Sequence, residues 1–159
     1  MAPLRIGILT CSDTRSQAED TAGRALIGLA EAAGWVVADY KVCADDRDTI
    51  ASAIIDMAAA GHADVVITCG GTGLSLRDVT PEATTDVAER RVPGIAEHLR
   101  AQSLLVTGRA MLSRAIAAQR GTTLIINFPG SEKAARESFG FVAAQLEHAV
   151  EMMHGGGHS

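Results

Sequence analysis

The sequence predicts an α/β protein whose mostly parallel sheet is covered by helices on both faces. Apolar strand-like runs alternate with Ala-rich helical stretches, and several runs are apolar at consecutive positions, as in strands buried on both sides. The 159 residues, 47% of them hydrophobic, suffice for one sizeable core and are too few for two ordinary domains. We therefore expect a single domain over residues 1–154. A disordered tail should follow over residues 155–159, because three consecutive glycines resist ordering.

The first half of the chain predicts three strands and two helices. LRIGILT and ADVVITC have the apolar character of buried strands, whereas WVVADYKV shows partial alternation. Ala25, Leu29 and Ala32 recur at helical spacing before Gly34 ends the first helix, and Gly61 ends the second. The expected order is strand 4–10, helix 21–33, strand 35–42, helix 49–60 and strand 63–69.

The second half predicts four helices and one more strand. Helical patterns cover residues 81–89, 94–103 and 110–119, and TTLIINF at 122–128 is typical of a buried strand. Ser131 is predicted to cap a last helix that reaches about Met153, because a serine side chain can accept a hydrogen bond from the first turn.

Four polar or glycine-bearing segments follow predicted strands: TCSDTRS, CADDRD, CGGTG and FPGS. In open α/β sheets, ligands bind outside the carboxyl ends of the strands. If these strands are parallel, the four loops meet at one rim, and the sequence therefore predicts a binding site there.

The glycine-rich loop at Gly70, Gly71, Thr72 and Gly73 fits neither G-x-x-x-x-G-K-[ST] nor G-x-G-x-x-G. Successive backbone N–H groups in such a loop can form an anion-binding nest for phosphates. The same residues are also compatible with a plain tight turn, since glycines are first of all turn formers.

Two aspartates are candidates for holding Mg²⁺ beside phosphates bound at this loop. Asp78 lies just past the glycines and Asp45 follows the second strand, and carboxylate oxygens are the donors that Mg²⁺ prefers. The alternative makes Asp78 a solvated acid or a cap for the helix at TPEA, and Asp45 one charge in an acidic turn. The residues alone leave both interpretations open.

Charge and cysteine usage exclude several other classes. The net charge of −5, with no Lys/Arg cluster, argues against nucleic-acid binding, and no apolar stretch approaches the length of a membrane span. We expect a cytoplasmic protein. Cys11, Cys43 and Cys69 are widely spaced and odd in number, which argues against a zinc site and favours reduced, buried or inert thiols near strand ends.

Taken together, the motifs resemble the MogA/MoaB family of molybdopterin adenylyltransferases, whose fold is shared with the G domains of gephyrin and Cnx proteins. The resemblance rests on SDTRS with EDTAG, the DD pair after the second strand, GGTGLSLRDVTPEAT, MLSRAIA and INFPGSEKAARE, and it runs from about Leu4 to Val150. It implies a three-layer αβα fold that binds molybdopterin and Mg-ATP. In that family, the terminal phosphate of the pterin attacks the α-phosphate of ATP, which gives adenylylated molybdopterin and pyrophosphate.

The resemblance also implies roles for individual residues. Asp78 and Asp45 match the family's functional aspartates and would hold Mg²⁺. Because the chain has only two lysines, metal and arginine must balance the charge of the two anions that react, and Arg77 or Arg114 would steady pyrophosphate; the alternative for Arg77 is a structural ion pair. The nucleotide-binding loop matches Gly70, Gly71, Thr72 and Gly73. The residues matched to the pterin or nucleotide pocket are Ser12, Asp13, Ser75, Arg77, Ser113, Arg114, Pro129, Gly130 and Ser131.

The resemblance further implies partners and assembly. It predicts a homotrimer or a hexamer of two trimers, and a MoeA-type protein that consumes the product for molybdate insertion. Two other classes stay open: a non-catalytic molybdopterin carrier of the MoaB type, and an interaction module as in gephyrin. Retention of both Asp45 and Asp78 argues against the carrier, and the lack of a linker or second domain argues against the module.

Overall fold

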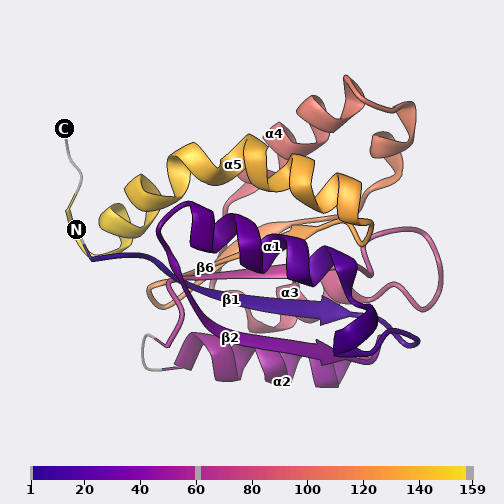
Figure 1. The fold of residues 1–159 in the computed structure, drawn as a ribbon, viewed down its shortest axis with the longest axis horizontal. Coiled ribbons are helices and arrows are strands. Elements are labelled where there is room, and N and C mark those ends of the chain that lie inside the picture. The colour runs from indigo at the N-terminus through magenta and orange to yellow at the C-terminus, as the bar shows by residue number, and fades with distance from the viewer. Residues whose placement is uncertain (1, 60–61, 157–159) are drawn as a thin grey trace.

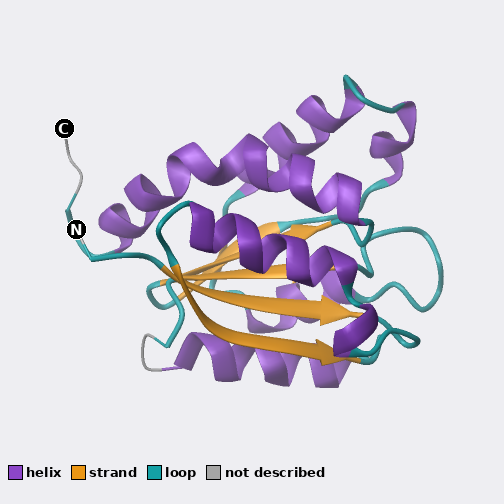
Figure 2. Ribbon diagram, viewed as in Figure 1, coloured by secondary structure: helices purple, strands orange, loops and turns teal. Residues whose placement is uncertain are grey.

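A computed structural model describes residues 2–59 and 62–156 (Figures 1 and 2). One six-stranded sheet, in the order β2-β1-β3-β6-β5-β4, carries helices on both faces, which confirms the predicted αβα layering. The strands are β1 Arg5–Cys11, β2 Val36–Cys43, β3 Val65–Cys69, β4 Arg90–Arg91, β5 Ala117–Arg120 and β6 Thr123–Phe128. The α-helices are α1 Thr21–Ala32, α2 Arg47–Ala58, α3 Thr80–Val87, α4 Pro93–Leu104 and α5 Glu132–Met153, and the 3-10 helices include η1 Gln17–Glu19 and η3 Gly108–Leu112.

The sheet is mostly parallel, as predicted. β1 pairs in parallel with β2 and β3, and β3 pairs in parallel with β6. Only the far edge reverses, where β5 runs antiparallel to β6 and β4 antiparallel to β5. The carboxyl ends of β1, β2, β3 and β6 therefore share one edge, and the arrowheads of β1 and β2 point to the same side in Figure 1.

Two apolar cores lie on opposite faces of the sheet because successive side chains of a strand point to opposite sides. Ile6 and Ile8 face α1, α4 and α5, whereas Leu9 faces α2 and α3. All three side chains are buried. The consecutive apolar residues in the central strands are thus explained by burial on both faces.

Side-chain caps fix where three helices begin. Ser131 accepts a hydrogen bond from the Ala134 backbone N–H and caps α5, which confirms the prediction. Asp46 caps α2 in the same way, so this helix starts before the predicted Thr49. Asp20, fully buried, caps α1 and also accepts hydrogen bonds from Thr10 Oγ1 and Tyr40 Oη at 2.6 Å each.

The predicted helix over residues 110–119 is wrong. A short 3-10 helix, η3, ends at Leu112, and Ala117–Arg120 forms strand β5. The Ala-rich composition favours a helix locally, but β5 fills the sheet between β6 and β4, and tertiary pairing overrides propensity. The two-residue strand β4 also escaped prediction.

The predicted tail is described only in part. The backbone N–H groups of Gly155 and Gly156 donate to the carbonyls of Met152 and Glu151 at the end of α5. The rest of the predicted tail, residues 157–159, lies outside the described residues.

Candidate functional site

The four loops that follow β1, β2, β3 and β6 meet at one rim of the sheet. Ser12 N donates to Cys43 O at 2.9 Å, which joins the first two loops. The backbones of the third and fourth loops are in contact, since a Cβ on Gly130 would lie 3.2 Å from the Cα of Gly70. Arg15 Nη1 also donates to Gly130 O at 2.9 Å, which links the first loop to the fourth.

The glycine loop adopts a backbone that other residues resist. Gly70 and Gly71 have φ values of 100° and 71°, in the left-handed region. A Cβ on Gly70 would lie 2.5 Å from Cys11 O, and one on Gly71 would lie 2.3 Å from Thr80 Oγ1. Glycine is therefore required at both positions, by conformation and by close packing.

The two candidate aspartates flank this loop from opposite ends. Positions for a Cβ on Gly71 and on Gly73 lie 3.3 Å from Asp45 Oδ1 and 2.9 Å from Asp78 Oδ2, respectively. Asp78 Oδ2 accepts a hydrogen bond from Ser75 N at 3.2 Å, and the N-cap of α3 is Val79, without a side-chain cap. The structure thus places Asp78 against the glycine loop and gives no support to its alternative role as a helix cap.

Asp45 is held by a reciprocal pair of hydrogen bonds to Asp13. Asp45 N donates to Asp13 Oδ1 at 2.9 Å, and Asp13 N donates to Asp45 Oδ2 at 3.1 Å. Desolvation raises the pKa of Asp45, and the negative charges of Asp13 and Asp78 add to this effect. The fold therefore brings three carboxylates, at Asp13, Asp45 and Asp78, close enough to influence one another.

Two buried oxygens at the rim lack hydrogen-bond partners. Within the residues that the structure describes, the only buried side-chain N or O atoms without one are Asp45 Oδ1 and Thr80 Oγ1. Both lie beside Gly71. A buried polar atom without a hydrogen bond destabilises the folded state unless a ligand, ion or water supplies the missing interaction. Thr80 was not among the predicted site residues; its only sequence signal is its place in the RDVTPE stretch.

Arg77 spans the rim and pairs with Asp13. Its Nε and Nη2 donate to Asp13 Oδ2 and Oδ1 at 2.9 and 3.0 Å, a bidentate pair that lowers the pKa of Asp13. The side chain of Arg77 remains 65% exposed. The structural ion pair considered from sequence is therefore present, and the guanidinium is also open to solvent at the mouth of the site.

Arg114 holds the glycine loop in place through hydrogen bonds to its backbone carbonyls. Its Nε donates to Gly73 O and its Nη2 to Asp78 O, both at 2.7 Å, and its Nη1 pairs with Glu82 Oε2 at 2.6 Å. Its backbone N donates to Thr72 O at 2.8 Å. The guanidinium is thus engaged with protein groups, which makes Arg114 a support of the loop that carries Gly73 and Asp78.

The predicted serines make local bonds that shape the loops. Ser12 Oγ accepts from the N–H groups of Thr14 and Arg15, and Ser75 Oγ accepts from Arg77 N at 3.2 Å. Ser113 Oγ accepts from Ala115 N at 3.2 Å, and Ser131 caps α5. All four lie in loops at the rim or beside it.

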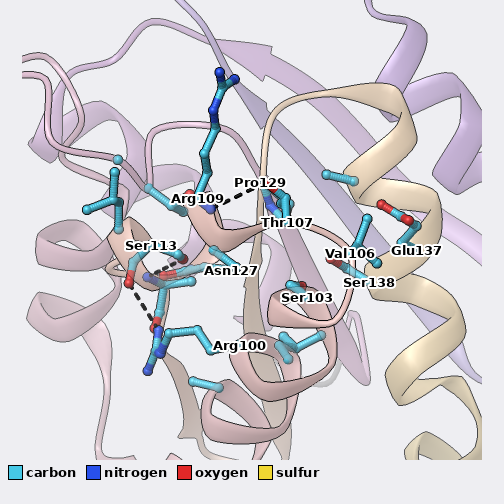
Figure 3. A pocket seen from close by; sticks show the side chains of 18 residues that line it. Arg100, Ser103, Val106, Thr107, Arg109, Ser113, Asn127, Pro129, Glu137 and Ser138 are labelled. Carbon is cyan, nitrogen blue, oxygen red and sulfur yellow. Dashed lines mark hydrogen bonds between the residues drawn. The ribbon is translucent and has the colours of Figure 1, made fainter.

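A cavity of about 280 Å³ opens next to the glycine loop (Figure 3). It lies among α4, η3 and the start of α5, and Thr72 and Gly73 border it on the loop side. Ser113 and Pro129, two predicted pocket residues, line it. The other polar residues of the wall, which sequence reasoning missed, are Arg100, Ser103, Thr107, Arg109, Asn127, Glu137 and Ser138.

Each of the first three strands ends at a cysteine, as predicted. Burial raises the pKa of Cys69 to about 12, and its Sγ donates to Pro129 O at 3.3 Å. Cys11 is buried as well, whereas Cys43 is half-buried. The hydrogen bond between these two thiols raises the pKa of Cys11 and lowers that of Cys43.

The donor set fits a magnesium ion that is shared with phosphates. In the described parts of the chain, no group of three or more His, Cys, Asp or Glu side chains forms a closed metal site. Mg²⁺ in phosphate-binding sites typically takes one or two carboxylates together with phosphate oxygens and waters. Asp45, with its unpartnered Oδ1, and Asp78 have the right chemistry for this arrangement.

Comparison with known proteins agrees with the fold and with the motifs. Residues 7–148 match the family model described as a probable molybdopterin binding domain. The chain is 37% identical to a molybdopterin adenylyltransferase of Helicobacter pylori strain J99, covering 98% of this chain and 90% of that protein. It is also 37% identical to molybdenum cofactor biosynthesis protein B of Escherichia coli K12, covering 91% and 86% of the two chains.

Solved structures show the same architecture. The crystal structure of MoaB from Thermus thermophilus is similar with a TM-score of 0.87 and 41% identity, covering 96% of this chain and 97% of that one. A structure of MogA is similar with a TM-score of 0.86 and 36% identity, covering 94% and 99%.

Proposed function

The chain belongs to the MogA/MoaB family of molybdopterin-binding proteins, and from this premise we propose that it is a molybdopterin adenylyltransferase. The observation that carries the proposal is the pairing of the glycine loop with Asp45 and Asp78 at one rim of the sheet. A close relative is named for this activity. The substrates are molybdopterin and ATP, and the products are adenylylated molybdopterin and pyrophosphate.

In the proposed reaction, an oxygen of the terminal phosphate of molybdopterin forms a bond to the α-phosphorus of ATP. The bond from that phosphorus to the bridging oxygen breaks, and pyrophosphate leaves with the electron pair. Two anions must approach one another, so the protein contributes alignment and charge compensation more than covalent chemistry. The N–H groups of the glycine loop and the exposed guanidinium of Arg77 supply positive potential on this chain.

Magnesium would be held by Asp45 and Asp78, and when bound it would neutralise charge on the phosphates. Arg114 keeps Asp78 and Gly73 in place through its bonds to their carbonyls.

We assign the pterin to the cavity beside Thr72 and Gly73. Its volume of about 280 Å³ approaches the range of small-ligand sites, and its lining combines apolar side chains with polar groups, as ring-binding pockets do. Ser113 lies at its wall and would meet a polar edge of the ring system (Figure 3).

Incubation of the protein with molybdopterin, ATP and Mg²⁺, followed by mass detection of the adenylylated pterin, tests the proposal. Asp78→Asn should lower the rate at least about 10²-fold, which is about 2.7 kcal/mol of barrier, while pterin binding persists. The amide oxygen can still accept the Ser75 N–H bond, so the loop should keep its shape. The matched control is Asp86→Asn, which changes an exposed carboxylate of α3 that pairs with Arg47 of α2 and should retain the rate.

Two results would overturn the assignment. Pterin binding by the wild-type protein without product would identify a carrier of the MoaB type. An Asp78→Asn protein that melts early yet keeps a near-normal rate would make Asp78 a structural residue of the turn.

Assembly, location and partner form a further part of the proposal. We propose a cytoplasmic homotrimer, or a hexamer of two trimers, that passes its product to a MoeA-type protein. Apolar side chains exposed at the end of α4 and in η3, such as Leu105 at 81% and Met111 at 69%, support self-association. Among residues 2–59 and 62–156, no helix has the length and apolar character to cross a bilayer. A monomer mass by light scattering at micromolar concentration would rule out the trimer.

A further inference from the structure

Cys11 and Cys43 occupy paired positions at the carboxyl ends of two adjacent strands. They are register partners in the parallel ladder of β1 and β2, and each is the last residue of its strand. Neighbouring strands lie about 4.8 Å apart. A disulfide requires a Cα separation of about 4.4–6.8 Å, so this pairing meets the first condition for a bond.

The two side chains also share one face of the sheet. Cys11 belongs to the core against α2 and α3, and Cys43 packs against the same core. Their thiols are close enough to interact. Cys69, at the end of β3, belongs to the core on the opposite face, and it pairs in register with Thr10. The third cysteine is therefore excluded from this pair by the direction of its side chain.

Cys43 is open to small solutes, while Cys11 is not. Cys43 is half-buried and lines an open hollow of about 560 Å³ between β2 and α2, together with Lys41 and Ser52. Cys11 is only 4% exposed and lies behind it. A solute in the hollow thus meets Cys43 first, with Cys11 as the thiol next to it.

From these observations we propose that Cys11 and Cys43 form an oxidisable thiol pair that closes to a disulfide when a peroxide reaches Cys43. The Cys43 sulfur attacks one peroxide oxygen; the S–O bond forms, the O–O bond breaks, and water leaves. The Cys11 sulfur then attacks the sulfenic sulfur of Cys43; the S–S bond forms, the S–O bond breaks, and the Cys11 proton leaves in a second water. Two thiols are oxidised and one hydrogen peroxide is reduced to two waters.

The disulfide would lie directly beneath the carboxylates of the rim. Asp13 follows Cys11 by two residues, Asp45 follows Cys43 by two, and these aspartates exchange hydrogen bonds. A bond between the sulfurs would tie the two strand ends, and the loops that follow them, to one another. The modification therefore connects oxidation to the rim on which the proposed function depends, and a dithiol reductant reverses it.

Peptide mapping of the full-length protein tests the inference. The native protein is treated with hydrogen peroxide, alkylated with iodoacetamide before unfolding, and digested with trypsin without reduction. The three cysteines lie on separate tryptic peptides, residues 6–15, 42–47 and 48–77. The expected product joins 6–15 to 42–47 with the loss of two hydrogens, leaves Cys69 reduced, and disappears with dithiothreitol.

Single variants sharpen the result. Cys69→Ser is the matched control and should form the same linked peptide. Cys11→Ser should leave Cys43 without its resolving thiol, so that peroxide converts Cys43 to sulfenic and then sulfinic acid. No linked peptide from the wild-type protein, a link to Cys69, or Cys43 sulfinic acid in the presence of Cys11 would each overturn the proposal.

The mapping needs neither pterin nor nucleotide, so it is independent of the proposed transferase activity. If the reduced protein makes no adenylylated molybdopterin but the linked peptide forms, the proposed function fails and the thiol pair stands. If the reduced protein is active, oxidation should lower its rate reversibly in the wild-type protein and in Cys69→Ser.

Discussion

Replacing Gly71 by alanine probes why the loop needs a glycine at this position. The residue has a φ of 71°, which costs alanine about 1–2 kcal/mol. The new Cβ would also lie 2.3 Å from Thr80 Oγ1 and 3.3 Å from Asp45 Oδ1. Thr80 is fully buried and cannot turn into solvent, so overpacking adds about 1–3 kcal/mol. The free energy of unfolding should fall by about 2–5 kcal/mol.

Thermal unfolding followed by circular dichroism measures this loss. At this chain length, 1 kcal/mol corresponds to about 2–4 °C, so the melting temperature of Gly71→Ala should fall by about 4–20 °C. Gly28→Ala is the matched control, because a Cβ on Gly28 in α1 meets nothing within 4 Å. Alanine should stabilise that helix by about 0.5–1 kcal/mol.

A second substitution separates the clash from the backbone strain. Thr80→Ala in the Gly71→Ala background removes the oxygen at 2.3 Å, and should recover the overpacking share while the strain of about 1–2 kcal/mol remains. If Gly71→Ala has the same melting temperature as the wild-type protein, the close contact between position 71 and Thr80 does not exist in solution.

Three further predictions concern the charges of the rim. Arg114→Lys should weaken ATP binding about tenfold by calorimetry, because one ammonium cannot reach Gly73 O, Asp78 O and Glu82 together. Arg136→Lys, which changes an exposed pair with Glu132, should leave the affinity for ATP unchanged. Equal affinities of the Arg114→Lys and wild-type proteins would show that Arg114 does not support the loop. Arg77→Ala should raise the pKa of Asp13 toward its ordinary value in a carboxyl NMR titration, since Arg77 is the main cause of its depression, and an unchanged titration would refute the ion pair. Asp45→Asn should abolish transfer yet stabilise the fold at neutral pH, because the amide carries no charge to be desolvated or to be repelled by Asp13 and Asp78. The folded-state pKa of Asp45 is raised, so the cost of its ionisation is present above that pKa and vanishes as pH falls. The stability gap between the wild-type protein and the Asn variant should therefore narrow on acidification, and a gap that widens would contradict the assignment.

The sequence predicted most of the fold because its signals are local. Apolar runs such as ADVVITC and caps such as Ser131 identify strands and helix starts without knowledge of the rest of the chain. The helix expected at 110–119 failed because β5 is defined by its partners, β6 and β4, and not by its own composition. Local patterns contain no information about such pairing.

The same limit applies to the site. Parallel strands placed the four loops at one rim, so Asp45 and Asp78 were predicted near the glycines. The contacts that organise them join residues far apart in sequence: Asp13 to Asp45 across 32 positions, Arg77 to Asp13 across 64, and Arg114 to Gly73 across 41. The folded backbone determines which of these residues meet. Their residue types alone predicted neither the hydrogen bonds by which Arg114 supports the glycine loop nor the unpartnered hydroxyl of Thr80.

The energetically unfavourable features of this fold lie together at the rim of the sheet, around the glycine loop. Gly70 and Gly71 hold left-handed backbones, and Gly73 and Gly130 leave no free space for a Cβ, whereas Gly28 in α1 would accept one. The two unpartnered buried oxygens lie beside Gly71. A loop selected only for stability would avoid the strained backbone and the unpartnered oxygens, for example with an amide in place of Asp45. Their retention together, around carboxylates that repel one another, is the arrangement expected where a bound phosphate and its cation complete the site.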